Sequence, residues 1–167
     1  IITPGHRVFL SHYQGRDGYF VNTRDSSQTD RYSFHWGNHT SVLRWNAVIR
    51  PGFFLNTSAY YSLYRFGEEF EISGKRKSGQ VSGSGLSEFS MKGDADLSLS
   101  AQSLKFGYQW SHQTFDPELT GFTGDTTTYL SSALPSSRAV SLSGYAEDEF
   151  RVFPRLMLNT GLRLQVY

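Results

Sequence analysis

The sequence predicts an all-β fold in which antiparallel up-and-down strands, about seven in this chain, form part of a larger transmembrane β-barrel. First, apolar and polar residues alternate over stretches of about ten residues, longer than the ~5–6 of ordinary strands and close to the ~9–11 that cross a bilayer at a tilt. Second, short and long connections between these stretches alternate, as in outer-membrane barrels. Third, 16% of the residues are aromatic although only 38% are hydrophobic. Such a balance is expected where lipid-facing side chains alternate with polar ones facing a lumen.

Four segments show the alternation most clearly. In the first, Leu43 and Trp45 point to one face, whereas Arg44 and Asn46 point to the other. Because side chains of a strand alternate between faces, each segment has one apolar and one polar side. The four predicted strands are residues 39–49, 53–66, 103–113 and 155–167.

Three further segments, residues 7–20, 89–99 and 139–152, have a weaker alternation and are also predicted as strands. In the last of them Asp148 falls on the apolar face, which predicts a position near the strand end or a β-bulge. Short connections are predicted at residues 50–52, 100–102 and 153–154, and long surface loops at residues 21–31, 67–87 and 116–137.

Residues 49–57 and 152–160 align without a gap, and this internal repeat predicts two hairpins with the same turn. Proline stands at the turn, where no hydrogen-bonding N–H is required. Chance recurrence of one turn chemistry is the alternative explanation. The coinciding pairs are Pro51 and Pro154, Leu55 and Leu158, Asn56 and Asn159, and Thr57 and Thr160.

The alternation alone does not separate a membrane barrel from a soluble β-sandwich, since either has an apolar and a polar strand face. The strand lengths and the large polar groups in mid-strand favour the barrel. Aromatic residues near the strand ends are expected to form interfacial girdles: Trp36, Phe53, Phe54, Phe66, Phe115, Phe150, Phe153 and Tyr167. The residues expected to face the lumen are Arg44, Asn46, Tyr60, Tyr64, Lys105, Gln109, Glu147 and Arg163.

Several short motifs resemble those of TonB-dependent outer-membrane receptors of the Bacteroidota type. They occur in family order: Trp36-Gly37-Asn38, Arg44-Trp45-Asn46, Phe54-Leu55-Asn56-Thr57 and Tyr61-Ser62-Leu63-Tyr64. The preceding strand, with Leu10-Ser11-His12-Tyr13, is similar as well. So is a C-terminal hairpin that carries Tyr145, Asp148-Glu149 and Gly161-Leu162-Arg163.

This resemblance implies a barrel of about 22 strands around an N-terminal plug, of which residues 1–167 would be a barrel segment without the plug. It implies a location in the outer membrane of a Gram-negative bacterium and a share in the uptake of a scarce nutrient, driven by the inner membrane through TonB. The implied partners are outer-membrane lipids, TonB, and the plug and remaining barrel of the same receptor, with a surface lipoprotein as a further candidate.

Other kinds of chemistry find little support. The chain has no Cys, and its net charge of +1 does not suggest binding to nucleic acid. On one strand, His35 and His39 would lie about 13 Å apart, too far to share a metal ion. Glu147 and Glu149 are better explained as a lumen-lining or plug-contacting pair than as a catalytic acid and base. We therefore expect no enzyme activity, no cofactor and no metal.

Two other architectures stay open at this point. One is a complete small outer-membrane barrel acting as an adhesin or porin-like protein. It would need an eighth strand from residues 30–36 or 129–134, because single-chain barrels have even strand numbers. The other is a soluble extracellular β-sandwich that binds a partner.

Overall fold

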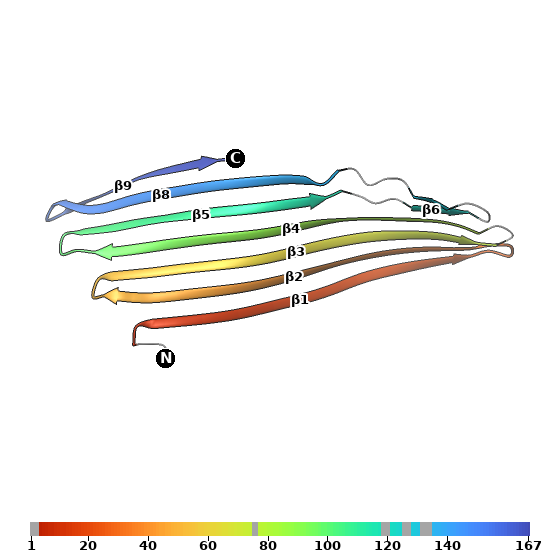
Figure 1. Cartoon of the computed structure of the whole chain (residues 1–167), viewed down its shortest axis with the longest axis horizontal. Coiled ribbons are helices and arrows are strands. Elements are labelled where there is room, and N and C mark those ends of the chain that lie inside the picture. The colour runs from red at the N-terminus through yellow and green to blue at the C-terminus, as the bar shows by residue number, and fades with distance from the viewer. Residues whose placement is uncertain (1–3, 75–76, 118–120, 125–127, 131–134) are drawn as a thin grey trace.

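The computed structural model describes residues 4–74, 77–117, 121–124, 128–130 and 135–167, which form one antiparallel sheet (Figure 1). Its path runs β1-β2-β3-β4-β5-β8-β9, so each long strand pairs with the long strand before it. The strands are β1 (His6–Arg24), β2 (Thr29–Arg50), β3 (Phe53–Ser73), β4 (Lys77–Ser98), β5 (Gln102–Asp116), β6 (Gly121–Gly124), β7 (Thr128–Leu130), β8 (Ser137–Phe153) and β9 (Leu156–Val166).

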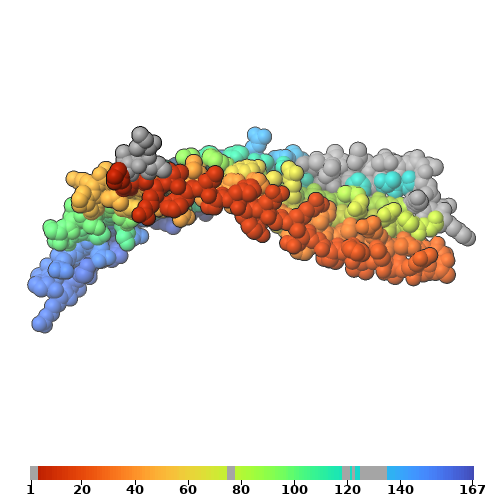
Figure 2. Space-filling view, turned by 90° about the horizontal axis from the view of Figure 1, so that it is seen from below, coloured from red at the N-terminus to blue at the C-terminus, as the bar shows by residue number. Residues whose placement is uncertain are grey.

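The meander of seven long strands confirms the all-β, up-and-down prediction. In the described part of the chain no second sheet covers this one, contrary to the sandwich alternative, and β1 and β9 lie at opposite edges. Within those same residues the strands therefore do not close into a small barrel. Seen from the β1 edge, the molecule is a bent layer whose C-terminal strands lie below β1 at one end (Figure 2).

Two of the three predicted long loops are wrong. Residues 21–31 consist mostly of strand, because β1 runs to Arg24 and β2 starts at Thr29. The predicted loop at 67–87 lies almost wholly in β3 and β4. Register is continuous through both regions, from Gly18↔His35 to Arg24↔Thr29 and from Gly67↔Gly83 to Ser73↔Lys77. Glycine, serine and charge suggest loops, yet here the backbones are paired. The upper part of β3 pairs with β2 and β4, and the end of β1, an edge strand, pairs with β2.

The third predicted loop, at 116–137, is a long connection: β5 ends at Asp116 and β8 begins at Ser137. It contains the short strands β6 and β7, which pair with each other, and β6 also adds to β4 beyond the end of β5. The three predicted short turns are all present, at one end of the sheet (Figure 1).

The two repeated hairpins share loop length and register, but not turn conformation. Arg50 pairs with Phe53 around Pro51-Gly52, and Phe153 pairs with Leu156 around the corresponding two residues. A register shift precedes each turn, between Val48 and Arg50 and between Arg151 and Phe153. The turn conformations differ: Gly52 has φ +79°, as required at the third position of a type II turn, whereas no described non-glycine residue, its counterpart Arg155 included, has positive φ.

Replacing Gly52 by alanine should destabilise the β3–β4 end of the sheet by about 1–2 kcal/mol, since an L-residue at positive φ costs that much. A Cβ atom there would also lie 2.7 Å from the Ser98 carbonyl oxygen. The measurement is the urea midpoint of unfolding. Gly79→Ala is the matched control, because its Cβ would meet only the Phe70 carbonyl oxygen, at 3.4 Å. Equal midpoints for the two variants would contradict the turn assignment.

Very little of the sheet is buried. Of the apolar residues that the structure describes, Ala47 and Ala95 are buried, whereas Leu10 is 78% and Leu162 66% exposed. A monomeric soluble protein rarely exposes such a continuous apolar surface. The apolar face therefore requires a covering, either lipid or protein.

Aromatic rings fill the space over two strand glycines. The Tyr108 ring lies over Gly93, and the Tyr145 ring lies over Gly107, where an added Cβ would approach each ring to 2.6 Å. Covering a strand glycine with a neighbouring aromatic ring stabilises sheets. These glycines and tyrosines are thus packed pairs rather than flexible points.

Candidate functional site

One face of the sheet carries a continuous apolar band near the short turns. Its side chains share a face because cross-strand partners project to the same side and alternate residues to opposite sides. One complete row of the band, from β1 to β9, is Leu10, Leu43, Ala59, Met91, Trp110, Leu142 and Val166.

The height of this band fits a membrane. On β3 it extends from Phe53 to Tyr61, a path of about 27 Å at ~3.4 Å per residue. The apolar band of outer-membrane barrels is ~25 Å tall, and a tilted strand crosses it with ~9–11 residues. With 21 residues, β3 is about twice as long as the crossing requires.

The register places every residue predicted to face the lumen on the opposite face. Arg44, Ser58, Lys92, Gln109 and Ser143 form one row of this polar face. The other predicted residues lie on the same side: Asn46 opposite Asn56, Tyr60 opposite Ser90, Tyr64 opposite Leu86, Lys105 opposite Glu147, and Arg163 opposite Tyr145.

Carboxylates organise hydrogen bonds on this polar face. The Glu88 carboxylate accepts from the hydroxyls of Tyr60 at 2.8 Å and Ser90 at 2.6 Å, and from the Gln113 amide at 3.2 Å. Asp94 accepts from the Tyr145 hydroxyl at 2.8 Å. These bonds join β3 to β5 and β4 to β8, and they hold the tyrosine rings in place.

Three polar oxygens of the same face are buried but have no hydrogen-bond partner: Asn46 Oδ1, Asn56 Oδ1 and Ser58 Oγ. Such atoms normally find a partner in protein or ordered water. They lie at the level of the apolar band, on the side away from it. This part of the polar face is thus suited to contact with water or with a polar protein surface.

Beyond the band, the two faces exchange character. The face that is apolar below carries Gln14, Arg16, His39 and Arg65 above it. The face that is polar below becomes aromatic, with a cluster that we call the aromatic wall. It consists of Tyr19, Tyr32, Phe34, Trp36, Tyr64 and Phe66, with neighbouring ring centroids 5.4–6.3 Å apart.

A polar contact anchors the aromatic wall at its far end. The Glu68 carboxylate accepts from the hydroxyls of Tyr32 at 3.1 Å and Ser82 at 2.9 Å. This hydrogen bond to a carboxylate raises the pKa of Tyr32. The wall therefore presents ring faces together with fixed polar groups.

The aromatic wall corrects part of the girdle prediction. Trp36, Phe66 and Phe115 lie on the face of Tyr64 and Glu88, away from the apolar band. Phe54, opposite Asp96, is also on the polar face, whereas Phe53 and Phe150 lie on the apolar side. The wall residues lie outside the predicted loops: Tyr19, Tyr64 and Phe66 fall in predicted strands, and the other three lie between the predicted loop 21–31 and the predicted strand 39–49. Their common face follows only from the register, which continues through the stretches predicted as loops.

The exceptional acidic residue on the apolar face lies near a strand end, as predicted. Asp148 sits close to the end of β8, and its Oδ2 accepts from the Gln102 amide at 2.7 Å. Glu147 and Glu149 share the polar face, on neighbouring rows opposite Gly161 and Asn159.

Among the described residues no three histidine or acidic side chains come together in a way that could hold a metal ion. His39 instead makes an edge contact with His12, with ring centroids 4.6 Å apart. The described elements include no helix long and apolar enough to cross a membrane.

No family model and no curated protein matches the sequence. The solved structures do contain similar folds. The chain superimposes on the ferric yersiniabactin uptake receptor FyuA from Yersinia pestis with a TM-score of 0.66 and 10% identity, over 95% of this chain and 25% of the receptor. It has the fold of a TonB-dependent receptor barrel wall. This barrel-wall fold agrees with the meander, the apolar band and the polar opposite face.

Weaker matches include the ferric citrate transporter FecA, with a TM-score of 0.49, 11% identity and coverage of 91% of this chain and 29% of that one. The siderophore receptor PirA from Pseudomonas aeruginosa has a TM-score of 0.39 and 17% identity, over 96% of this chain and 38% of that one. The barrel wall seen here thus spans about a quarter to two fifths of these chains.

Proposed function

We propose that this chain is part of the wall of a TonB-dependent outer-membrane transporter that takes up a scarce nutrient with energy from the inner membrane. The proposal rests on a change along the strands: one face of the sheet is apolar near the short turns and polar beyond, whereas the other face is polar near the short turns and aromatic beyond. Lipid requires an apolar outer face only within the bilayer, and a lumen requires polar groups at the same height. In this sheet the apolar face stops being apolar, and the polar face becomes aromatic, at about the same distance from the short turns. Nothing in this arrangement calls for enzyme chemistry.

The orientation follows from the turns. Short turns of outer-membrane barrels are periplasmic, so residues 51–52, 99–101 and 154–155 would face the periplasm. The long ends of β1–β4 would then project from the cell, with the aromatic wall on the inner side of the barrel mouth. There it would contact the incoming nutrient before the nutrient reaches the lumen.

The polar face below the aromatic wall would line the lumen and contact the plug. Its predicted residues, Arg44, Lys105 and Arg163 among them, together with the unpartnered oxygens of Asn46 and Asn56, suit such a hydrated contact. TonB would act on the plug. A surface lipoprotein partner and a Bacteroidota-type receptor belong to the same proposal, on the sequence motifs alone.

The orientation is tested by cysteine labelling, since the chain has no Cys. We expect a membrane-impermeant maleimide to label Gln28→Cys in intact cells, and Ala101→Cys only after the outer membrane is broken. Both residues are exposed, in the turns at opposite ends of the sheet. Labelling of both variants in intact cells, or of Ala101→Cys alone, would overturn the proposed orientation.

Transport is tested with iron-55 supplied as ferric yersiniabactin, the compound named for the receptor that superimposes with a TM-score of 0.66. Uptake that requires the intact protein and stops when a protonophore collapses the inner-membrane gradient would support the proposal. The double variant Phe34→Ala/Phe66→Ala should bind this chelate more weakly. Uptake that continues unchanged with the protonophore would contradict energy-driven transport.

A further inference from the structure

The outward face just above the apolar band is basic. Arg16 and Arg65 project from this face, in one row with Gly37 between them: Arg16 pairs with Gly37, and Gly37 with Arg65. Adjacent strands lie ~4.8 Å apart, so the two Cα atoms are about 10 Å from each other. Two guanidinium groups at that separation are able to reach one anion from opposite sides.

A hollow of about 400 Å³ lies at this point. Arg16, Arg65, His35 and His39 contribute to its lining, and no carboxylate does. Gly37 keeps the hollow open between the strands, since a Cβ there would approach the Gly15 carbonyl oxygen to 3.0 Å. Arg16, Arg65 and His35 are exposed.

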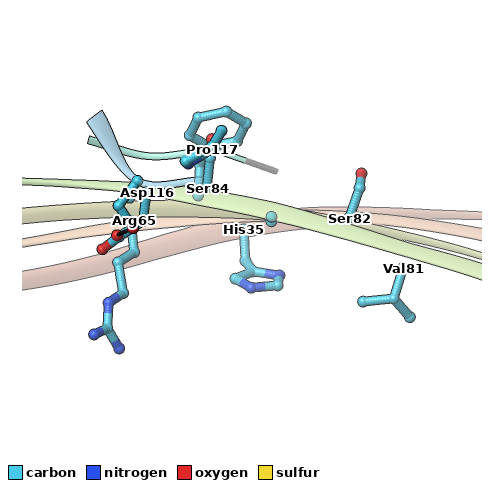
Figure 3. A pocket seen from close by; sticks show the side chains of 12 residues that line it. His35, Arg65, Val81, Ser82, Ser84, Asp116 and Pro117 are labelled. Atoms are coloured by element: carbon cyan, nitrogen blue, oxygen red, sulfur yellow. Dashed lines mark hydrogen bonds between the residues drawn. The ribbon is translucent and has the colours of Figure 1, made fainter. Parts of the chain in front are cut away.

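A second hollow, of about 560 Å³, adjoins the first and shares His35 and Arg65 with it. In Figure 3, His35, Arg65 and Val81 project to one side of the sheet, whereas Ser82 and Ser84 project to the other. The His35 ring lies over Gly67, where an added Cβ would be 2.7 Å from its Nε2. The carboxylate here, Asp116, accepts from the Ser136 hydroxyl at 2.6 Å. It lies in the row of Arg65, across Gly85, on the side opposite to Arg16.

We propose that Arg16 and Arg65 bind a phosphate group of the outer-leaflet glycolipid, lipid A. Three observations favour this ligand. The guanidinium pair matches a phosphate in charge and in its forked hydrogen-bond geometry. The hollow opens outward, to the side of the apolar band. It also stands directly above that band, at the height of the lipid headgroups, since His12 and Ser41 mark the row where apolar side chains end.

The polar row below the site supports this position. The Ser41 hydroxyl lies 3.0 Å from His12 Nδ1 and 3.5 Å from His39 Nε2. These hydrogen-bonded polar groups would lie at the height where the acyl chains of the lipid end and the headgroups begin. Basic side chains at such a boundary attract anionic lipids. The inference rests on the proposed outer-membrane orientation of the sheet.

The test is a titration of the intact protein, purified in detergent, with bis-phosphorylated lipid A, followed by native mass spectrometry. Each of Arg16→Gln and Arg65→Gln should weaken binding about fivefold, and the double variant about 25-fold. The matched control is Arg31→Gln, which removes the same charge from the same face farther from the band, where Arg31 lies over the Phe20 ring at 5.8 Å.

Dephosphorylated lipid A, which keeps its acyl chains, should bind the unchanged protein as weakly as bis-phosphorylated lipid A binds the double variant. Inorganic phosphate should compete only at millimolar concentration. Equal binding of lipid A by the unchanged protein and the double variant, or equal binding of the two forms of lipid A, would overturn the inference. Failure of the proposed function would appear separately, as absence of the protein from the outer membrane.

Discussion

Replacing Leu43 by arginine should prevent stable insertion of the barrel into a membrane. Leu43 lies in the apolar band with Leu10 and Ala59 as its neighbours across the sheet, and it is 50% exposed in the isolated wall. An arginine on the lipid face of a barrel costs about 2–4 kcal/mol at the middle of the bilayer and less toward its edges, and Leu43 lies one apolar row from the middle row of the band, that of Trp45 and Thr57. The expected result is a large loss of the fast-migrating folded form on unheated gels after refolding into vesicles.

The adjacent residue provides the control. Val42→Arg introduces the same charge one position away on the same strand, but on the polar face beside Ser11 and Tyr60. We expect it to insert nearly as well as the unchanged protein. If both variants insert equally, or if Val42→Arg is the more damaging, the assignment of the two faces is wrong.

Replacing Gly107 by alanine should be the most destabilising small change in the polar face. Its Cβ would lie 2.6 Å from the Tyr145 ring, 2.7 Å from the Gly93 carbonyl oxygen and 2.9 Å from Asp94 Oδ1. Overpacking of this kind costs about 1–3 kcal/mol. Displacement of the Tyr145 ring would also break its hydrogen bond to the Asp94 carboxylate. Loss of that bond would lower the free energy of unfolding by a further amount of about 1.5–3 kcal/mol.

Gly144→Ala is the matched control, because its Cβ would meet only the Gly107 carbonyl oxygen, at an ordinary 3.6 Å. The urea midpoint should fall strongly for Gly107→Ala and hardly at all for Gly144→Ala. Tyr145→Phe separates the two causes, since it removes the hydroxyl and keeps the ring. A Gly107→Ala protein as stable as the control would show that this ring does not pack over the glycine.

The fold could be predicted where the side chains alternate by hydropathy. The alternation of Leu43, Arg44 and Trp45 is the pattern expected where a bilayer and an aqueous lumen impose opposite requirements on the two faces. The register places Arg44, Lys105, Glu147 and their companions together on the polar face, and their position in a lumen stays a prediction. Proline at position 51 marked the turn.

The upper half of the sheet could not be predicted in this way. In the proposed orientation both faces of this half would meet water above the membrane, so hydropathy would not have to alternate there, and residues such as Glu68, Glu69 and Gly83 look like loop residues. Glu68 and Glu69 are held in β3 by pairing with β2 and β4, and Gly83 is held in β4 by pairing with Gly67 of β3. The aromatic wall was not predicted: Trp36 and Phe66 were assigned to interfacial girdles, Tyr64 was assigned to the lumen, and the other three rings were not assigned.

The length of β1–β4 has a consequence for how a ligand would be captured. A binding surface built on loops must lose conformational freedom when it closes on its ligand, and that loss weakens binding. Here the rings of Phe34 and Phe66 stand on paired strands, 6.3 Å apart between centroids, before any ligand arrives. Capture at the barrel mouth would then be preorganised, with an association rate set by diffusion and orientation rather than by the folding of a loop.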